Sequence, residues 1–198
     1  MRKSVFTVLF CVGVLSGEAN GLNLTPLRIM ITNDGPPQER YFFQDADKRL
    51  GFRIDRKMTV SGSNDLAIFR FSDFNAATMR LLKSPAPASV PFDQKGLESY
   101  QTVARTLLPP DAANVQLVQI IPDAISINGW KSAQFIYSYD LSGLSYRRAI
   151  AFLNFRENQQ FVFDVSARAE NYDKVYSRGY RVLNSLFELP PSGAPGPS

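Results

Sequence analysis

The sequence contains no histidine, and its single cysteine is Cys11. Without histidine, Ser-His-Asp and Cys-His catalysis, histidine-ligated zinc or haem and imidazole proton transfer are excluded. Cys11 lies in a segment that we expect to be removed, so thiolate metal centres and disulfides are also excluded from the mature chain. No GxGxxG or GxxxxGK phosphate loop occurs. We therefore expect no cofactor and no metal, and carboxylate chemistry is what remains for an enzyme.

Residues 1–21 have the pattern of a secretory signal peptide. Arg2 and Lys3 precede an apolar run over 5–15, and Ala19-Asn20-Gly21 offers a small-x-small cleavage site. The alternatives are a short buried helix or a membrane anchor, but a run this short spans only about half of a bilayer core. We expect cleavage after Gly21, export to the periplasm or the medium, and no stable membrane span afterwards.

The remaining chain is expected to form one domain with a mildly basic surface. The formal net charge is +4, and removing Arg2, Lys3 and Glu18 with the signal leaves +3. These charges are spread along the sequence, which gives no basis for a nucleic-acid partner. Residues 22–49 are interpreted as an N-terminal segment and linker, in which 41–43 form a short strand or an anchor on the core. Residues 50–189 form the domain, and 190–198 a disordered Pro/Gly-rich tail.

The segment 129–189 predicts three strands closed by a helix. Apolar residues alternate over 129–140, 145–155 and 159–169, and connectors of hairpin length separate these runs, which predicts an antiparallel meander. From Tyr172 to Phe187 the apolar positions follow helical spacing. Asn171 is available as the helix cap, and Pro190-Pro191 as its stop.

A second meander and a second helix are predicted upstream. Its strands are expected at 51–60, 66–72 and 77–82, followed by a Pro-rich connector over 84–91. Asp93 caps a helical stripe that runs to Leu108, and short β-prone runs follow at 115–121 and 124–127.

The acidic residues have structural interpretations that we favour over catalytic ones. Asp45 and Asp47 would be paired acids or ligands for a hard cation, but a solvated loop is favoured because their spacing is poor for calcium. Asp164 lies within a predicted strand beside Arg168. We expect it to pair across strands with an arginine rather than to act as a general acid or base.

Candidate partner-binding residues are five arginines and the only tryptophan. The arginines would converge on one side as an anion-binding surface, or they would be scattered and solvated. Trp130 would be an interface anchor if exposed, or a core residue if buried. The candidates are Arg147, Arg148, Arg168, Arg178, Arg181 and Trp130.

Over 50–189 the order of elements resembles the PsbP family and its wider superfamily, which includes the Ran-binding Mog proteins, DcrB-type envelope proteins and LpqN-type lipoproteins. The resemblance is carried by Leu50-Gly51-Phe52-Arg53-Ile54, by the helix from Asp93, by Ile127-Asn128-Gly129-Trp130 and by the helix from Asn171-Tyr172. It implies an α+β domain whose antiparallel sheet has helices on both faces. It also implies a non-catalytic adaptor or assembly role.

The sequence thus predicts an exported, non-enzymatic domain that binds a protein or an envelope component. Two alternatives stay open. A carboxylate-dependent hydrolase would need two acids in one cleft with shifted pKa values. A small-ligand carrier would need an aromatic pocket beside Tyr137, Tyr139 and Phe163.

Overall fold

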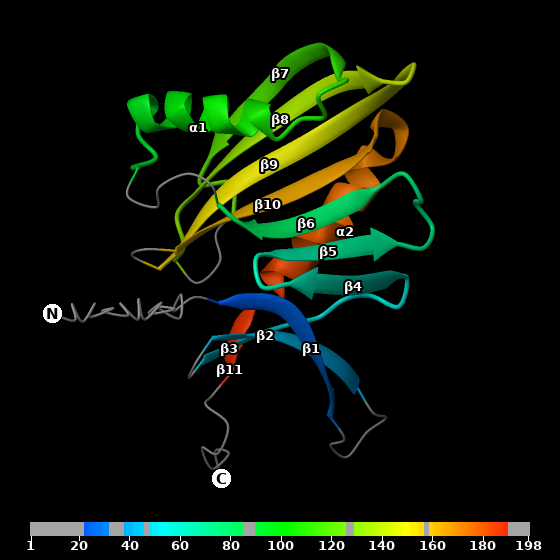
Figure 1. The fold of residues 1–198 in the computed structure, drawn as a ribbon, viewed down its shortest axis with the longest axis vertical. Helices are drawn as coiled ribbons and strands as arrows, with labels where there is room; N and C mark the ends of the chain where they lie inside the picture. The colour runs from blue at the N-terminus through cyan, green and yellow to red at the C-terminus, as the bar shows by residue number, and fades with distance from the viewer. Residues whose placement is uncertain are drawn as a thin grey trace, which may run out of the picture.

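The computed structural model describes residues 22–31, 38–45, 48–84, 90–125, 129–156 and 159–189 (Figure 1). The helices are α1 (Gln94–Thr106) and α2 (Tyr172–Asn184), with a 3-10 turn at Ala169–Asn171. The strands are β1 (Asn23–Ile31), β2 (Gln38–Asp45), β3 (Lys48–Phe52), β4 (Met58–Ser63), β5 (Leu66–Phe71), β6 (Thr78–Lys83), β7 (Ala113–Pro122), β8 (Ser132–Leu141), β9 (Leu144–Arg156), β10 (Gln159–Arg168) and β11 (Phe187–Leu189). The expected signal peptide, the tail 190–198, Asp47 and the side chain of Asp45 lie outside the described residues.

The strands form two antiparallel sheets, and the predicted meanders lie in the larger one. Its order is β4-β5-β6-β10-β9-β8-β7, while the smaller sheet has the order β1-β2-β3-β11. The predicted meander β8 to β10 is confirmed, and in the upstream meander the predicted second and third strands are confirmed as β5 and β6, which pair in order with β4. The β8–β9 hairpin turns at Ser142 and Gly143, whose φ angles of 52° and 77° suit a two-residue hairpin turn. The α+β class with antiparallel sheets is therefore confirmed.

The strand predicted over 51–60 is wrong, because two strands of different sheets occupy it. β3 ends at Phe52 and β4 begins at Met58. Between them, Asp55 accepts hydrogen bonds from the backbone of Lys57 at its Oδ1 (2.8 Å) and from Met58 N at its carbonyl (3.0 Å). This turn separates the strands. We call residues 53–57 the connector.

Residues 22–49, interpreted as an N-terminal segment and linker, supply β1, β2 and the start of β3. Leu22, Leu24 and Phe43 are almost fully buried in the core. The backbone of Leu24 also donates to Asn64 O beside β4 (3.1 Å), so β1 covers the edge of the larger sheet. This segment is therefore an integral part of the fold.

Helix α1 begins as predicted, while α2 ends earlier than predicted. Asp93 Oδ1 accepts a hydrogen bond from Gly96 N (2.8 Å), which caps α1. Asn171 holds the cap position of α2 without a side-chain capping hydrogen bond, and α2 stops at Asn184. Phe187 lies in β11 opposite Gly51 and not on the helix. Ala124 and Ile125, predicted as part of a strand, lie in a loop.

The two helices pack against different apolar clusters of the larger sheet. Tyr100 and Ala104 of α1 pack with a cluster that includes Phe135 and Phe152. Val175, Val182 and Leu183 of α2 pack instead with Phe163, Val165 and the apolar residues of the smaller sheet. A Cβ at Gly179 would lie 3.2–3.3 Å from side-chain atoms of β6 and β10, so glycine allows the close approach of α2. No helix in the described part of the chain is long and apolar enough to cross a membrane.

Candidate partner-binding site

Arg148, a predicted partner-binding residue, is buried in an ion cluster. Its Nε and Nη2 donate to the carboxylate of Asp164 at 2.7 and 2.6 Å. Arg80 of β6 donates to the same carboxylate, from Nε at 2.8 Å and also from Nη2. The predicted cross-strand pairing of Asp164 with an arginine is therefore confirmed. Only Arg80 is partly exposed, with about a third of its side chain open to solvent (34%).

Arg147 and Arg148 are neighbours in sequence but project from opposite faces of β9. Arg148 shares the α1 side of the sheet with Ile150, whereas Arg147 alternates to the α2 side. There Arg147 is exposed and close enough to Tyr172 to influence its pKa, which burial raises. The structure therefore does not bring the five predicted arginines together on one surface.

Arg178 is held in ion pairs along one side of α2. It donates from Nε and Nη2 to the two carboxylate oxygens of Asp55, both at 2.8 Å, and from Nη1 to Asp73 at 2.6 Å. Its guanidinium also stacks over Phe71 and Phe74, 5.1 and 5.7 Å from the ring centroids. These hydrogen bonds to Arg178 hold the pKa of both carboxyls below the ordinary value.

Two neighbouring hollows lie along the connector, and they share Arg53, Ile54, Asp55 and Met58. The first, about 460 Å³, is also lined by Met30, Glu39, Arg40, Tyr41 and Arg56. The second, about 400 Å³, is also lined by Arg178, Arg181, Val182, Asn184 and Ser185. We call the two hollows together the arginine groove.

The acids of the arginine groove are already paired, whereas its three exposed arginines form no ion pair with a described residue. Glu39 forms an ion pair with Arg28 and accepts a hydrogen bond from the Tyr41 hydroxyl (2.9 Å). Asp55 is held by Arg178. By contrast, Arg53, Arg56 and Arg181 are exposed and form no ion pair with any described residue. The groove therefore presents unneutralised positive charge.

Sequence reasoning singled out Arg178 and Arg181 but missed Arg53 and Arg56. The latter two lie in the connector, which was interpreted as strand. The Ser185 hydroxyl at the end of α2 accepts a hydrogen bond from Arg53 N (2.9 Å) and so brings the connector beside Arg181. The sequence signal for this site was an arginine on each side of Asp55, in a segment that breaks the strand.

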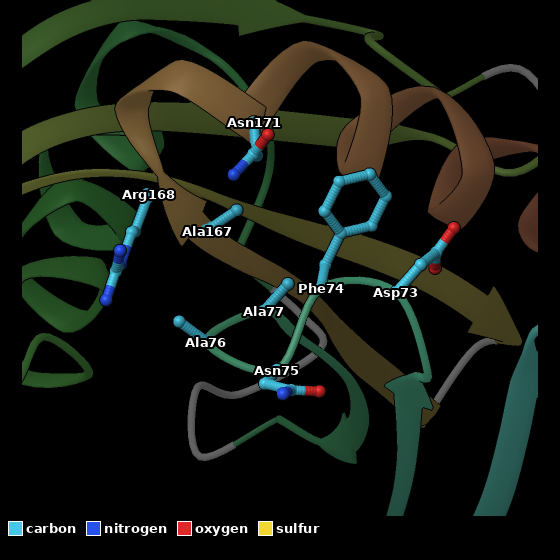
Figure 2. A pocket seen from close by; sticks show the side chains of 8 residues that line it. All are labelled: Asp73, Phe74, Asn75, Ala76, Ala77, Ala167, Arg168 and Asn171. Carbon is cyan, nitrogen blue, oxygen red and sulfur yellow. The ribbon is translucent and has the colours of Figure 1, made fainter.

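Arg168 lines a separate hollow of about 300 Å³ at the start of α2. Figure 2 shows its side chain and the Phe74 ring on opposite sides of this hollow, with Asn171 near the helix start. Asp73 also lines the hollow, but its carboxylate is bound to Arg178. This hollow therefore adds one exposed arginine and no converging set of groups.

The remaining candidates have core positions. Trp130 is half-buried and packs edge-on against Phe155, with centroids 4.7 Å apart. Tyr137 and Tyr139 are buried in the cluster under α1, whereas Phe163 belongs to the cluster under α2. These three rings therefore do not line one shared pocket. Within the described residues, no group of three or more Asp, Glu or Cys is arranged to hold a metal ion.

No protein-family model matches the sequence, and no curated protein matches it. Among solved structures, the chain is similar to protein PA94 of Pseudomonas aeruginosa, of unknown function (12% identity, 86% of this chain, 99% of that chain, TM-score 0.43). It is also similar to cyanobacterial PsbP from Synechocystis (13%, 91%, 97%, 0.41) and to LpqN, involved in cell envelope biogenesis of Mycobacterium tuberculosis (10%, 83%, 92%, 0.40). These likenesses are distant, and they carry no conclusion on family or function.

Proposed function

We propose that the protein is an exported, non-enzymatic binding domain that holds an acidic segment of a partner protein in the arginine groove. The observation that carries the proposal is the charge balance of the groove. Arg53, Arg56 and Arg181 form no ion pair with a described residue, although Arg181 is close enough to Asp55 to help lower its pKa, and both acids that line the groove are paired with other arginines. Guanidinium groups match carboxylates in shape and charge, so a partner's acidic side chains would pair with these arginines and neutralise their charge.

We further propose the PsbP-like sandwich, with a helix on each face of the larger sheet, as the scaffold of this site. Support comes from β10, in which Val162 and Phe163 alternate between the α1 cluster and the α2 cluster. Figure 1 draws α1 in front of the larger sheet and α2 behind it. In this arrangement the end of α2 and the connector lie at the boundary between the larger and the smaller sheet, where an adaptor would expose its binding groove.

The ionisation of the acids supports a binding role over a hydrolase. Asp55 and Asp73 have lowered pKa values because Arg178 donates to them. Asp140 has a lowered pKa because the side chains of Asn114 and Ser145 donate to it. A general acid near neutral pH needs a raised carboxyl pKa, and these three environments act in the opposite direction.

Peptide binding tests the proposal directly. Fluorescence anisotropy would measure the affinity of a labelled Glu-rich peptide, with a Lys-rich peptide of equal length as the control of opposite charge. We expect the Glu-rich peptide to bind, and the double variant Arg53→Glu/Arg181→Glu to lose at least ten-fold in affinity. The matched control is Arg70→Glu/Lys131→Glu, which reverses two exposed cations elsewhere on the surface. Equal loss in the control, or no binding of the Glu-rich peptide, would overturn the proposal.

A further inference from the structure

We infer that the arginine groove recognises a segment in which a large apolar residue is flanked by acidic residues. The inference rests on the proposed function and specifies its ligand. The two hollows of the groove share Ile54 and Met58, and each hollow has one exposed arginine that the other lacks: Arg56 in the first and Arg181 in the second. An occupant that spans both hollows would therefore pass over apolar atoms between two positive charges.

The groove has a floor of apolar residues, of which Ile54 and Met58 line both hollows and Val182 lines only the second. Met58 and Val182 are buried, with 5% and 4% of their surface exposed, and Ile54 is half-buried. Arg53, which lines both hollows, is exposed. A ligand with acidic groups alone would leave this floor in contact with water. One large apolar side chain would cover it and gain the free energy of burial.

The ligand must itself carry negative charge, because the acids of the groove are already paired with arginines of the protein. Asp55 is bound bidentately by Arg178, and Glu39 by Arg28. Carboxylates entering either hollow therefore meet arginines whose charge is not cancelled within the site. Besides the shared Arg53, Arg56 lines only the first hollow and Arg181 only the second, so the complementary pattern has an acid on each side of the apolar residue.

The connector is held rigid, so little ordering is needed on binding. Arg53 N donates to the Ser185 hydroxyl (2.9 Å), and Lys57 N donates to Asp55 Oδ1 (2.8 Å). The same Asp55 is fixed by two hydrogen bonds from Arg178. A preformed site of this kind loses less conformational entropy than a flexible loop would.

The depth of the apolar residues favours a protein segment over a membrane surface. A bilayer is bound through apolar side chains that project beyond the charged ones. Here Met58 and Val182 lie at the floor, and among the apolar side chains of the groove only Met30 is largely exposed (52%). A side chain carried by an extended peptide can reach that floor, whereas a flat lipid surface cannot.

Three peptides of equal length and charge would test the inference by fluorescence anisotropy. In the first, glutamates flank a central leucine; in the second, serine replaces the leucine; in the third, the leucine stands at the end, away from the glutamates. We expect the first to bind roughly ten-fold more tightly than the other two, as burial of one large apolar side chain predicts. Ile54→Ser should reduce this preference to about three-fold or less, while Arg56→Glu should weaken all three peptides.

Each outcome decides between the inference and the function on which it rests. Equal affinity for the three peptides would overturn the inference and leave an acidic-segment binder. Failure of all three, together with binding to vesicles rich in phosphatidylglycerol, would overturn both in favour of anionic lipid. Thermal melts would show whether Ile54→Ser is folded, and Val60→Ser serves as the control for a general loss of stability. If Ile54→Ser is unfolded, the affinities of the three peptides for the unchanged protein still decide whether the inference holds.

Discussion

Arg148 donates two hydrogen bonds, of 2.7 and 2.6 Å, to the carboxylate of Asp164, and both side chains are almost completely buried. Arg80 approaches the same carboxylate from β6. A single negative charge thus accommodates two guanidinium groups at the junction of β6, β10 and β9. Because Arg148 is buried and bound to Asp164, we infer that its main role is to hold the three strands in register.

Asp164→Asn should destabilise the protein strongly. Removing one member of a buried ion pair typically costs about 3–5 kcal/mol, because the partner charge remains buried without compensation. Here two guanidinium groups would face each other across a neutral amide. Denaturant melts would measure the loss in free energy of unfolding.

The matched control is Arg70→Gln, an exposed arginine of β5 with no ion pair to a described residue. It should change stability by no more than about 0.5 kcal/mol. A similarly small change for Asp164→Asn would show that the cluster contributes little, and that Arg148 is free for another role.

Gly51→Ala should destabilise the protein through Phe187. A Cβ at Gly51 would lie 2.7 Å from Phe187 Cζ, and overpacking of this kind typically costs about 1–3 kcal/mol. In a Phe187→Leu background the cost should fall, because the shorter side chain leaves room. A double-mutant cycle from urea melts would measure the coupling. Strict additivity would mean that β11 does not pair with β3 in solution.

The strands that local periodicity describes were predictable, and the break before β11 was not. Val162 and Phe163 alternate sides in β10, and period-two alternation depends only on neighbouring residues. At the end of α2, however, Leu186 and Phe187 continue helical spacing. What ends the helix is the pairing of Phe187 with Gly51, which is a long-range contact that local pattern cannot contain.

The candidate site was half predictable for the same reason. Arg178 and Arg181 lie on one helix, so their common side follows from the sequence. Their companion Arg53 reaches them through the hydrogen bond with Ser185, 132 residues away in sequence. The separation of Arg147 from Arg148, in contrast, follows from strand alternation alone.

We predict that the mature protein begins at Leu22. The prediction rests on the basic start, the apolar run and the small residues before position 22. Leu22 and Leu24 are buried at 1% and 0% exposure, so further trimming would remove core contacts. Mass spectrometry of the protein from its native host would show the N-terminus. A chain that retains Met1, or that carries a lipid on Cys11, would contradict export by this route.

Arg178 should make stability depend on pH in the acid range. Its hydrogen bonds lower the pKa of Asp55 and Asp73 in the folded protein below the ordinary carboxyl value of 3.8. A carboxyl with a depressed folded pKa stabilises the protein above its unfolded pKa, and this contribution disappears as the pH falls through the folded pKa. We therefore expect the difference in unfolding free energy between the unchanged protein and Arg178→Gln to be constant from about pH 7 to about pH 5, and to shrink below about pH 4.

Urea melts at a series of pH values would measure this difference, with Arg53→Gln as the matched control. Arg53 is exposed and forms no ion pair with a described residue, so its replacement should give a difference that does not vary with pH. For Arg178→Gln a constant remainder should persist in acid, because the contacts of the guanidinium with Phe71 and Phe74 do not depend on carboxyl ionisation. A difference that stays unchanged down to pH values near 2 would mean that both carboxyls titrate alike in the folded and unfolded chain. In that case Arg178 would be held by its aromatic contacts, and Asp55 would be free to compete for ligands in the arginine groove.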